Sequence, residues 1–281
     1  MSARVGLIHL ASGSLGPEPL AAFLRSYAEH DAGVEHDLLV VLNGVATERD
    51  AEPFRALLEG HDHGTLMVER RVTDLAAYRG AAEALERPLL CLTNARSVVL
   101  AGGWLQRLTG KAALTDVGAA ATTGTWESHL TGATTPVPRG DMSALRRAAA
   151  EAARIAMLPR YRRAFLPFPN PHLRTNAFAI RRELFLSLEW PEPRSKFAAH
   201  ALESGREGMT RQLTARGLRC VVVGRDGAEY GPNDWPRSRT FRCGGQENLL
   251  VGDRRTEQYE RADAVERRRL AELAWGPGVT P

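Results

Sequence analysis

Polar side chains that could bind a ligand follow the apolar runs in the first half of this sequence. Ser12, Asn43 and Asn94 each stand at the end of such a run, and Arg96 follows Asn94 by two residues. If the runs are parallel strands, these residues meet at the carboxyl edge of one sheet, where open α/β sheets bind their ligands. We therefore expect a binding site at that edge, with the Arg96 guanidinium available to an anion.

Two carboxylates stand farther along the chain, within a segment that predicts one long helix. Glu203 and Glu207 lie four residues apart in residues 196–216, and Gly217 would end the helix. Side chains four residues apart share a helix face, so both carboxylates could face one cleft, and a positioned carboxylate can act as a general base. The alternative for Glu203 is a surface position paired with Arg206, three residues away.

Several familiar sites are excluded because their required residues are missing. The sequence has no Walker A lysine loop, no HExxH and no GxSxG. The turn at residues 13–16 matches only part of a dinucleotide fingerprint, and no acidic residue ends the second expected strand. Cys91, Cys220 and Cys243 form no CxxC pair, which indicates free thiols and a cytoplasmic chain. We assign no metal ligands.

The elements that must position these residues form an alternating pattern. Apolar runs alternate with amphipathic segments, which predicts a mostly parallel sheet covered by helices. Strands are expected over residues 4–10, 37–42, 64–68, 88–92, 117–122, 174–180 and 219–223. Helices are expected from the turn after the first strand to residue 27 and over residues 52–58, 74–85, 142–157, 183–188, 196–216 and 254–275. Residues 123–140, rich in Gly, Thr and Pro, predict an active-site loop.

Composition and charge narrow the class of protein. The 281 residues are 43% hydrophobic and 25% charged, as in an ordinary globular protein. The net charge is +4, and the arginines are interleaved with Asp and Glu along the chain, so we expect no nucleic-acid partner. The longest apolar stretch, residues 88–105, contains Asn94 and Arg96, which predicts no membrane span. The N-terminus predicts no secretory signal.

An ordered set of segments resembles the inverting family 2 glycosyltransferases of the GT-A fold. The set comprises the carboxyl-edge residues, the helix DLAAYRG (74–80), the run CLTNARSVVLAGGWLQRL (91–108), the strand RTNAFAIRR (174–182) and the helix ESGREGMTRQLTARG (203–217). The resemblance covers roughly residues 3–225 and is more specific as an ordered set than motif by motif. It implies a single GT-A-like α/β domain that transfers a sugar from a nucleotide-sugar donor.

The resemblance also implies roles for individual residues. The donor would be a UDP- or dTDP-sugar, and the acceptor is unknown. Residues expected to bind the donor are Ser12, Asn43, Asp74 and Arg79 at the base and ribose, and Asn94 and Arg96 at the diphosphate. Glu203 or Glu207 would take the proton of the acceptor hydroxyl.

Two departures from the family pattern change the expected chemistry. The family's Asp-x-Asp, which holds a divalent cation against the diphosphate, is Asn94-Ala95-Arg96 here. Oxygen ligation of Mg²⁺ or Mn²⁺ is therefore doubtful, and Arg96 would replace the cation unless it is an ordinary surface arginine. The family's Glu-Asp pair is Glu203-Ser204, so the aspartate that usually acts as general base is absent.

The expected organisation is one GT-A-like domain over residues 1–235 with an extension. Residues 1–122 would bind the nucleotide, residues 123–235 the acceptor, and residues 236–281 would form a basic loop and a C-terminal helix. Arg237, Arg239 and Arg242 are either a candidate lid over a diphosphate or part of a plain connector. The rival function is a non-catalytic GT-A-like protein that binds a sugar nucleotide or a partner enzyme. A nucleotidyltransferase is disfavoured because no Arg- or Lys-containing phosphate loop follows the first strand.

Overall fold

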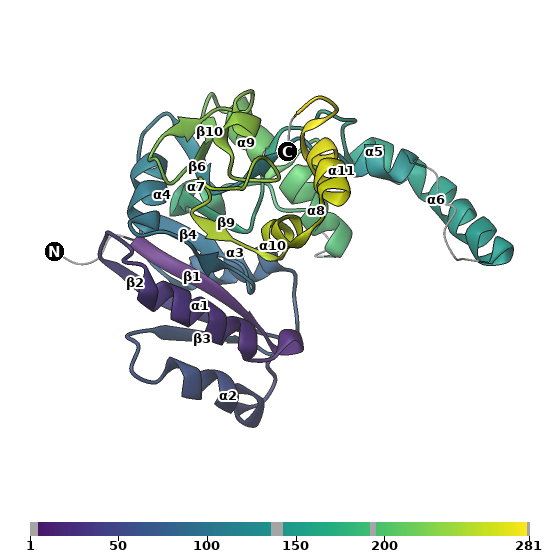
Figure 1. Ribbon diagram of the computed structural model, residues 1–281. Helices are drawn as coiled ribbons and strands as arrows, with labels where there is room; N and C mark the ends of the chain where they lie inside the picture. Colours follow the sequence, from purple (N-terminus) through teal and green to yellow (C-terminus); the bar gives the residue numbers. More distant parts are fainter. Residues whose placement is uncertain (1–4, 136–142, 192–194, 280–281) are drawn as a thin grey trace.

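The computed structural model describes residues 5–135, 143–191 and 195–279. Its centre is an eight-stranded sheet in the order β11-β10-β6-β9-β4-β1-β2-β3 (Figure 1). The strands of this sheet are β1 (Val5–Ser12), β2 (His36–Asn43), β3 (Gly64–Val68), β4 (Leu89–Thr93), β6 (Val117–Ala121), β9 (Ala177–Arg181), β10 (Arg219–Val223) and β11 (Glu229–Tyr230). The expected α/β class, with a mostly parallel sheet flanked by helices, is confirmed.

Strand direction is uniform except at two places. β1 pairs in parallel with β2 and β4, β2 with β3, and β6 with β10. β11 runs antiparallel to β10 at one edge. β9 lies between β4 and β6 and is antiparallel to both. The amino end of β9 therefore lies at the same edge of the sheet as the carboxyl ends of β4 and β6.

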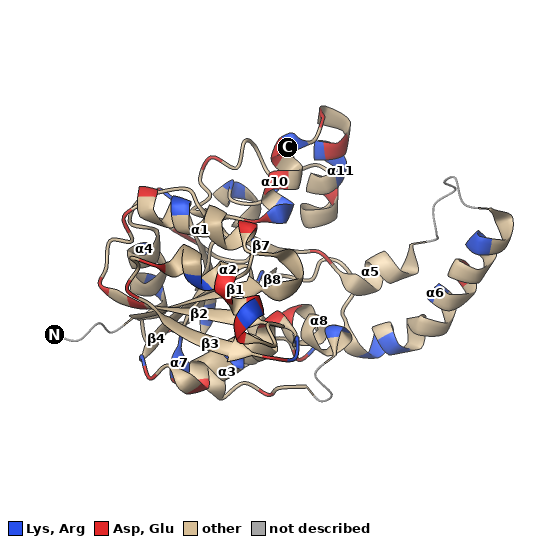
Figure 2. Ribbon diagram, turned by 90° about the horizontal axis from the view of Figure 1, so that it is seen from below, with Lys and Arg blue, Asp and Glu red and all other residues tan. Residues whose placement is uncertain are grey.

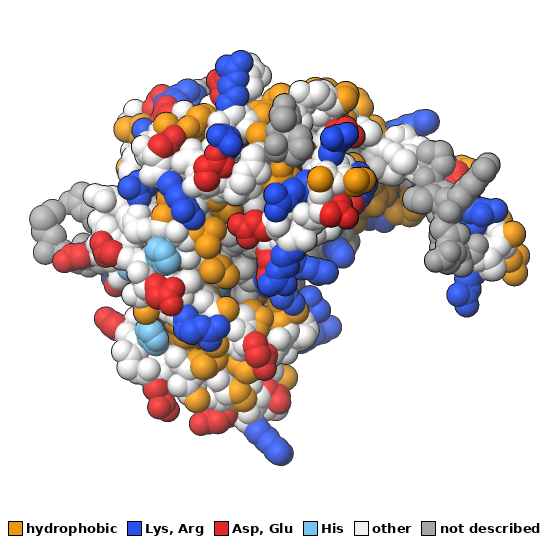
Figure 3. All heavy atoms as spheres, in the orientation of Figure 1, with side chains coloured by type: hydrophobic (Ala, Val, Ile, Leu, Met, Phe, Trp, Pro, Cys, Tyr) orange, Lys and Arg blue, Asp and Glu red, His pale blue; other side chains and the backbone are white. Residues whose placement is uncertain are grey.

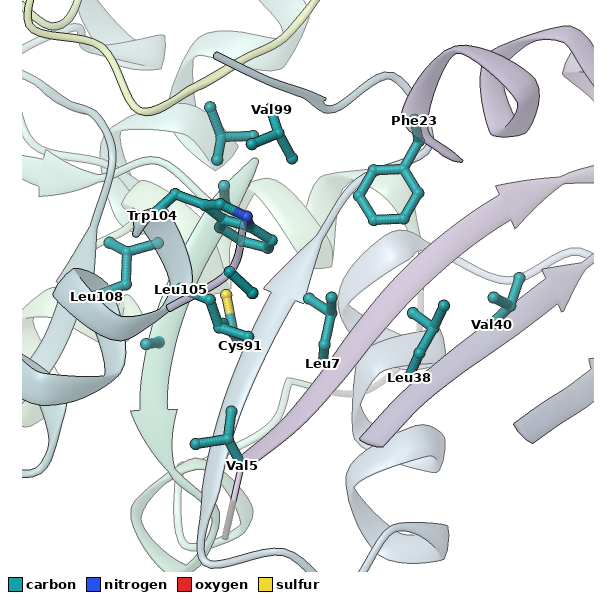
Figure 4. Packing of buried hydrophobic residues seen from close by; sticks show 14 of the residues in the cluster. Val5, Leu7, Phe23, Leu38, Val40, Cys91, Val99, Trp104, Leu105 and Leu108 are labelled. Atoms are coloured by element: carbon teal, nitrogen blue, oxygen red, sulfur yellow. The ribbon is translucent and has the colours of Figure 1, made fainter. Parts of the chain in front are cut away.

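Alternation along β1 explains why helices cover both faces of the sheet. Successive strand side chains point to opposite faces. Val5 and Leu7 join the core under α1 (Glu18–Glu29), α2 (Glu48–Leu58) and α4 (Trp104–Ala112), part of which Figure 4 shows. Ile8 and Leu10 join the core under α3 (Asp74–Ala84), α7 (Arg182–Leu186), α8 (Lys196–Ser204) and α9 (Met209–Ala215). The continuous apolar runs thus reflect strands that are buried on both sides.

The expected helix over residues 196–216 is two helices, so that expectation is wrong. α8 ends at Ser204 and α9 begins at Met209. Gly205 leaves the helix to pair with Phe165, and a Cβ on Gly205 would lie 2.3 Å from the carbonyl oxygen of Ala201. Two glycines within four residues weaken a helix, and this pairing gives the backbone another partner.

The expected helix over residues 254–275 is also divided. α10 (Arg254–Arg261) and α11 (Ala264–Trp275) are separate helices, each begun by an aspartate whose side chain caps it. Before α10, β12 (Val251–Gly252) pairs with β5 (Val98–Val99) in a two-stranded sheet. The C-terminal extension is therefore tied to the turn that follows β4.

Residues 123–140, expected to be a loop, begin with ordered elements. β7 (Gly124–Thr125) pairs with β8 (His172–Leu173), and α5 (His129–Thr134) follows it. Residues 136–140 lie outside the described part of the chain. The helix expected over residues 142–157 is α6 (Ala144–Ala164), although Met142 also lies outside the described residues. α6 buries none of its side chains and projects from the body (Figures 1 and 2).

Within the described residues, none of the helices combines the length and the apolar character needed to cross a bilayer.

Candidate functional site

A cleft of about 940 Å³ opens at the edge of the sheet where β1 and β4 end and β9 begins. Ser12, Asn94 and Arg96 line it from the carboxyl ends of β1 and β4, as the sequence predicts. Asp74 lines it from the first turn of α3, and Glu203 from the last turn of α8. The structure thus brings together five of the residues proposed from sequence.

Reversal of β9 builds the centre of the cleft. The backbone N–H of Asn94 donates to the carbonyl oxygen of Asn176 over 2.9 Å, and the Ser97 hydroxyl donates to the same oxygen over 3.1 Å. The side-chain oxygen of Asn94 accepts hydrogen bonds from the Arg96 N–H at 2.9 Å and from the Ser97 hydroxyl at 3.2 Å. Asn94 therefore shapes the turn that carries Arg96.

Glu203 is a carboxylate held in its ionised form. Its Oε1 accepts hydrogen bonds from the backbone N–H of Thr175 at 3.1 Å and from the Thr175 hydroxyl at 2.9 Å. Burial raises the pKa of Glu203, but His172, the two bonds from Thr175 and the nearby charge of Arg174 together hold that pKa below its ordinary value. Among the described residues no hydrogen bond reaches Oε2, which leaves that oxygen for an incoming hydroxyl.

Buried polar groups surround this carboxylate. Arg174 donates to Asp253 over 2.6 Å, and both side chains are less than a tenth exposed. His172 is buried, which lowers its pKa, although the charge of Glu203 opposes that shift. Asn176 is 4% exposed; its Oδ1 accepts from the Thr123 hydroxyl at 2.7 Å, while its Nδ2 has no hydrogen-bond acceptor among the described residues. An unsatisfied buried donor is costly, so Asn176 is a candidate ligand contact.

Asp74 lines the cleft from the first turn of α3. Partial burial and the negative charge of Glu203 raise the pKa of Asp74, and Arg71 opposes the shift. Arg71 also lines the cleft. The carboxylates of Asp74 and Glu203 are therefore close enough for their charges to interact across the cleft.

Two expected donor-binding residues lie elsewhere. Asn43 is buried; its Nδ2 donates to the carbonyl oxygen of Val72 at 2.9 Å and its Oδ1 accepts from the Val72 N–H at 3.0 Å, so it braces the loop before α3. Arg79 pairs with Glu83, and its guanidinium lies 5.3 Å from the centre of the Trp190 ring. Neither residue lines the cleft.

Glu207 does not share a helix face with Glu203. It lies in the break between α8 and α9 with an exposed side chain, and its backbone carbonyl accepts a hydrogen bond from Gln212 at 2.7 Å. The expectation that Glu203 and Glu207 both face one cleft is therefore wrong, because the single helix that it assumed is broken between them. The Arg206 alternative for Glu203 also fails, because the Arg206 side chain donates to the carbonyl oxygen of Arg162.

The three arginines expected to form a lid lie outside the cleft lining. Arg237 and Arg239 are exposed and pair with Asp234 and Glu247. Arg242 is buried and pairs with Glu127 at 2.5 Å, and its neighbour Phe241 is fully buried. Because this segment is packed into the protein, its structure favours the connector interpretation.

Sequence reasoning missed the residues that precede β9 and those that begin α10. Arg174, Thr175 and Asn176 line the cleft because β9 is reversed, and the sequence does not reveal strand direction. The available signal was that these three polar residues stand directly before an apolar run. Thr93 and Asn94 stand directly after another apolar run in the same way. The charged segment that contains Asp253 and Arg254 reads as a solvated helix, although both residues line the cleft.

Residues 94–96 do not fit a divalent cation. Mg²⁺ and Mn²⁺ prefer carboxylate and other oxygen ligands. Asn94 is the only residue of 94–96 with a side-chain oxygen, that oxygen already accepts two hydrogen bonds, and Arg96 adds a positive charge. In the described part of the chain, moreover, no three His, Cys, Asp or Glu side chains cluster as metal ligands.

No protein-family model matches the chain, and no curated protein matches it. Solved structures do show similarity. A mannosyltransferase from Pyrobaculum calidifontis, in complex with GDP-mannose and Mn²⁺, is 16% identical at a TM-score of 0.49, over 85% of this chain. This chain spans 60% of that protein's length.

Two further structures widen the set. The galactosyltransferase LgtC, in complex with donor and acceptor sugar analogues, is 9% identical at a TM-score of 0.44, over 76% of this chain and 72% of its own. The 4-diphosphocytidyl-2C-methyl-D-erythritol synthase from Anaerococcus prevotii is 15% identical at a TM-score of 0.45, over 81% of this chain and 92% of its own. The solved structures that this chain is similar to thus include two sugar transferases and a 4-diphosphocytidyl-2C-methyl-D-erythritol synthase.

A stability measurement separates the connector from a lid. Replacing Arg242 by Ala removes a buried partner of Glu127, so we expect the free energy of unfolding to fall by about 3 kcal/mol in urea titration. Arg237→Ala is the matched control: the side chain is 83% exposed, and the expected change is below about 0.5 kcal/mol. An Arg242→Ala protein of unchanged stability that binds nucleotide more weakly would restore the lid.

Proposed function

We propose that this protein is a glycosyltransferase that moves a sugar from a nucleotide-sugar donor to an acceptor hydroxyl. The observation that carries the proposal is the pairing of opposite chemistries in one cleft. An ionised carboxylate, Glu203, lies in it together with Arg96, a guanidinium without a carboxylate partner among the described residues. Glycosyl transfer needs both, since the acceptor loses a proton and the leaving diphosphate carries negative charge.

Glu203 supplies the base. Its Oε2 takes the proton of the acceptor hydroxyl. At the same time, the hydroxyl oxygen forms a bond to the anomeric carbon. The bond from that carbon to the diphosphate breaks at the same time, and its electron pair leaves with the nucleoside diphosphate. Attack from the face opposite the leaving group inverts the anomeric centre. Thr175 holds Oε1 throughout, which fixes the direction of Oε2.

Arg96 neutralises the leaving group. A guanidinium forms bidentate, charge-assisted hydrogen bonds to phosphate, and it needs no metal ligands around it. Ser12 and Asp74 contact the nucleoside of a UDP- or dTDP-sugar, because they line the cleft beside β1 and α3. Residues 1–122 supply these donor contacts, and residues 123–235 supply Glu203 and the acceptor side.

Loss of the guanidinium should weaken donor binding. We expect Arg96→Ala to raise the Kd for UDP or dTDP by about 10- to 100-fold, or about 1.5 to 3 kcal/mol, the range for hydrogen bonds to charged groups. Isothermal titration calorimetry measures this directly. Affinity in EDTA should match affinity in Mn²⁺. Strict Mn²⁺ dependence together with an unaffected Arg96→Ala variant would mean that the diphosphate binds elsewhere.

Loss of the carboxylate should remove turnover and spare binding. A general base contributes about 10²- to 10⁴-fold, so Glu203→Gln should lower kcat by about that factor with little change in donor Kd. Because the pKa of Glu203 lies below its ordinary value, the base stays ionised at neutral and at mildly acidic pH. The wild-type rate should therefore be lost only at more acidic pH, as Glu203 becomes protonated.

Glu207→Gln is the matched control for this experiment. Its side chain is exposed and lies outside the cleft lining, so its turnover should equal that of the wild type. If the wild type binds a donor but neither transfers nor hydrolyses its sugar across a broad acceptor panel, the rival function is correct. The protein would then be a non-catalytic sugar-nucleotide binder, and Ser204, whose hydroxyl donates to the backbone of His200, would mark the lost base.

A further inference from the structure

The arginines around the cleft differ in what neutralises them. Arg174 pairs with Asp253, and Arg255 pairs with Glu127. Arg96 and Arg254 are both exposed and both line the cleft, yet across residues 5–135, 143–191 and 195–279 neither has a carboxylate within 4.0 Å. Figure 3 shows basic side chains gathered over the region of α10, which Arg254 begins.

The small β5–β12 sheet brings these two arginines together. Val99 pairs with Val251 and Val98 with Gly252 in antiparallel register. Arg96 lies two residues before Val98 and Arg254 lies two residues after Gly252, so both arginines lie beyond the same end of this small sheet. Two like charges at one end of a sheet repel each other, and an anion bound between them would relieve that repulsion.

Asp253 cannot be that anion, because its oxygens already have partners. It accepts from Arg174 at 2.6 Å and from the backbone N–H groups of Arg255 and Thr256 at 3.0 Å each. Burial raises the pKa of Asp253, but Arg174 and these hydrogen bonds hold it below its ordinary value. The fixed Asp253 anchors the amino end of α10, whose helix dipole adds positive potential beside Arg254.

Glu127 and Glu203 also line the cleft but already have partners, which leaves two carboxylates as competitors for this position. Glu272 lines the cleft from α11, and Asp74 lines it from α3 beside Arg71. Neither forms an ion pair with Arg96 or Arg254 in the described structure. Among the described residues, the cleft lining therefore carries two positive charges that no acidic side chain pairs with.

We propose that Arg96 and Arg254 form a two-arginine clamp that binds the diphosphate of the donor. This inference rests on the proposed function and adds to it a residue from the C-terminal extension. Two planar guanidinium groups can each hold one phosphate group through paired hydrogen bonds, and a diphosphate presents two such groups side by side. A nucleoside monophosphate can engage only one of them, so the clamp discriminates by phosphate number.

Calorimetric titration of the full chain with UDP, UMP and inorganic pyrophosphate tests the clamp. Arg254→Ala should weaken UDP and pyrophosphate by about 10- to 100-fold and UMP by less than about threefold. Arg261→Ala is the matched control, because this arginine lies at the far end of α10 and pairs with Glu257. Its affinities should equal those of the wild type. The double variant Arg96→Ala/Arg254→Ala should lose less than the product of the two single effects.

Each outcome separates the clamp from the proposed function. If UDP binds and Arg254→Ala leaves its Kd unchanged, the clamp is wrong while the proposed function stands. If pyrophosphate binds and depends on Arg254 but no nucleotide binds, the clamp stands and the proposed function is wrong. If the wild type binds none of the three, both are overturned. Arg254→Lys, which keeps the charge but loses the paired geometry, should recover only part of the affinity.

Discussion

The cleft depends on the hydrogen bonds that pair β9 with β4 and β6 in the antiparallel direction. A parallel strand in that place would carry its first residues to the opposite edge of the sheet. The reversed strand instead sets Thr175 and Asn176 beside Asn94, with the Asn176 carbonyl accepting from both Asn94 and Ser97. One strand direction therefore joins the segment that orients Glu203 to the segment that carries Arg96.

Charge in the cleft is organised around that junction. Buried carboxylates are stable only when hydrogen bonds and opposite charges compensate their desolvation, and Glu203, Asp253 and Glu127 all have such partners. These paired side chains have fixed positions in the cleft. Arg96 and Arg254 have no carboxylate partner among the described residues, so they remain available to a ligand. This division accounts for a cleft that presents Arg96 just beyond the carboxyl end of β4.

The sequence predicted the parts of the fold that depend on local pattern. Apolar runs located the strands because both faces of the sheet are covered. The strands expected over residues 64–68 and 219–223 have the expected ends, and the other five are present with ends shifted by one to three residues. It did not predict the break at Gly205, which depends on a tertiary pairing with Phe165. Asn43 was misassigned for a similar reason: its position at a strand end is visible in the sequence, but its bonds to Val72 are not.

For the site as well, the sequence predicted what depends on local pattern and missed what depends on tertiary contacts. Ser12, Asn94 and Arg96 were found because parallel strands share an edge, which is a property of topology that the pattern reveals. Arg254 was missed because its place depends on the pairing of two very short strands, β5 and β12. A two-residue strand has no periodic signal, so no reading of the C-terminal segment alone could bring it to the cleft.

The most direct test of the account is a crystal structure of the protein grown with a UDP- or dTDP-sugar in the presence of EDTA. The account predicts electron density for the diphosphate beside Arg96, at the carboxyl ends of β1 and β4, with the sugar toward Glu203 and no metal peak. A nucleotide bound at any other place, or a diphosphate ordered only when Mn²⁺ is added and held by the metal rather than by Arg96, would contradict it.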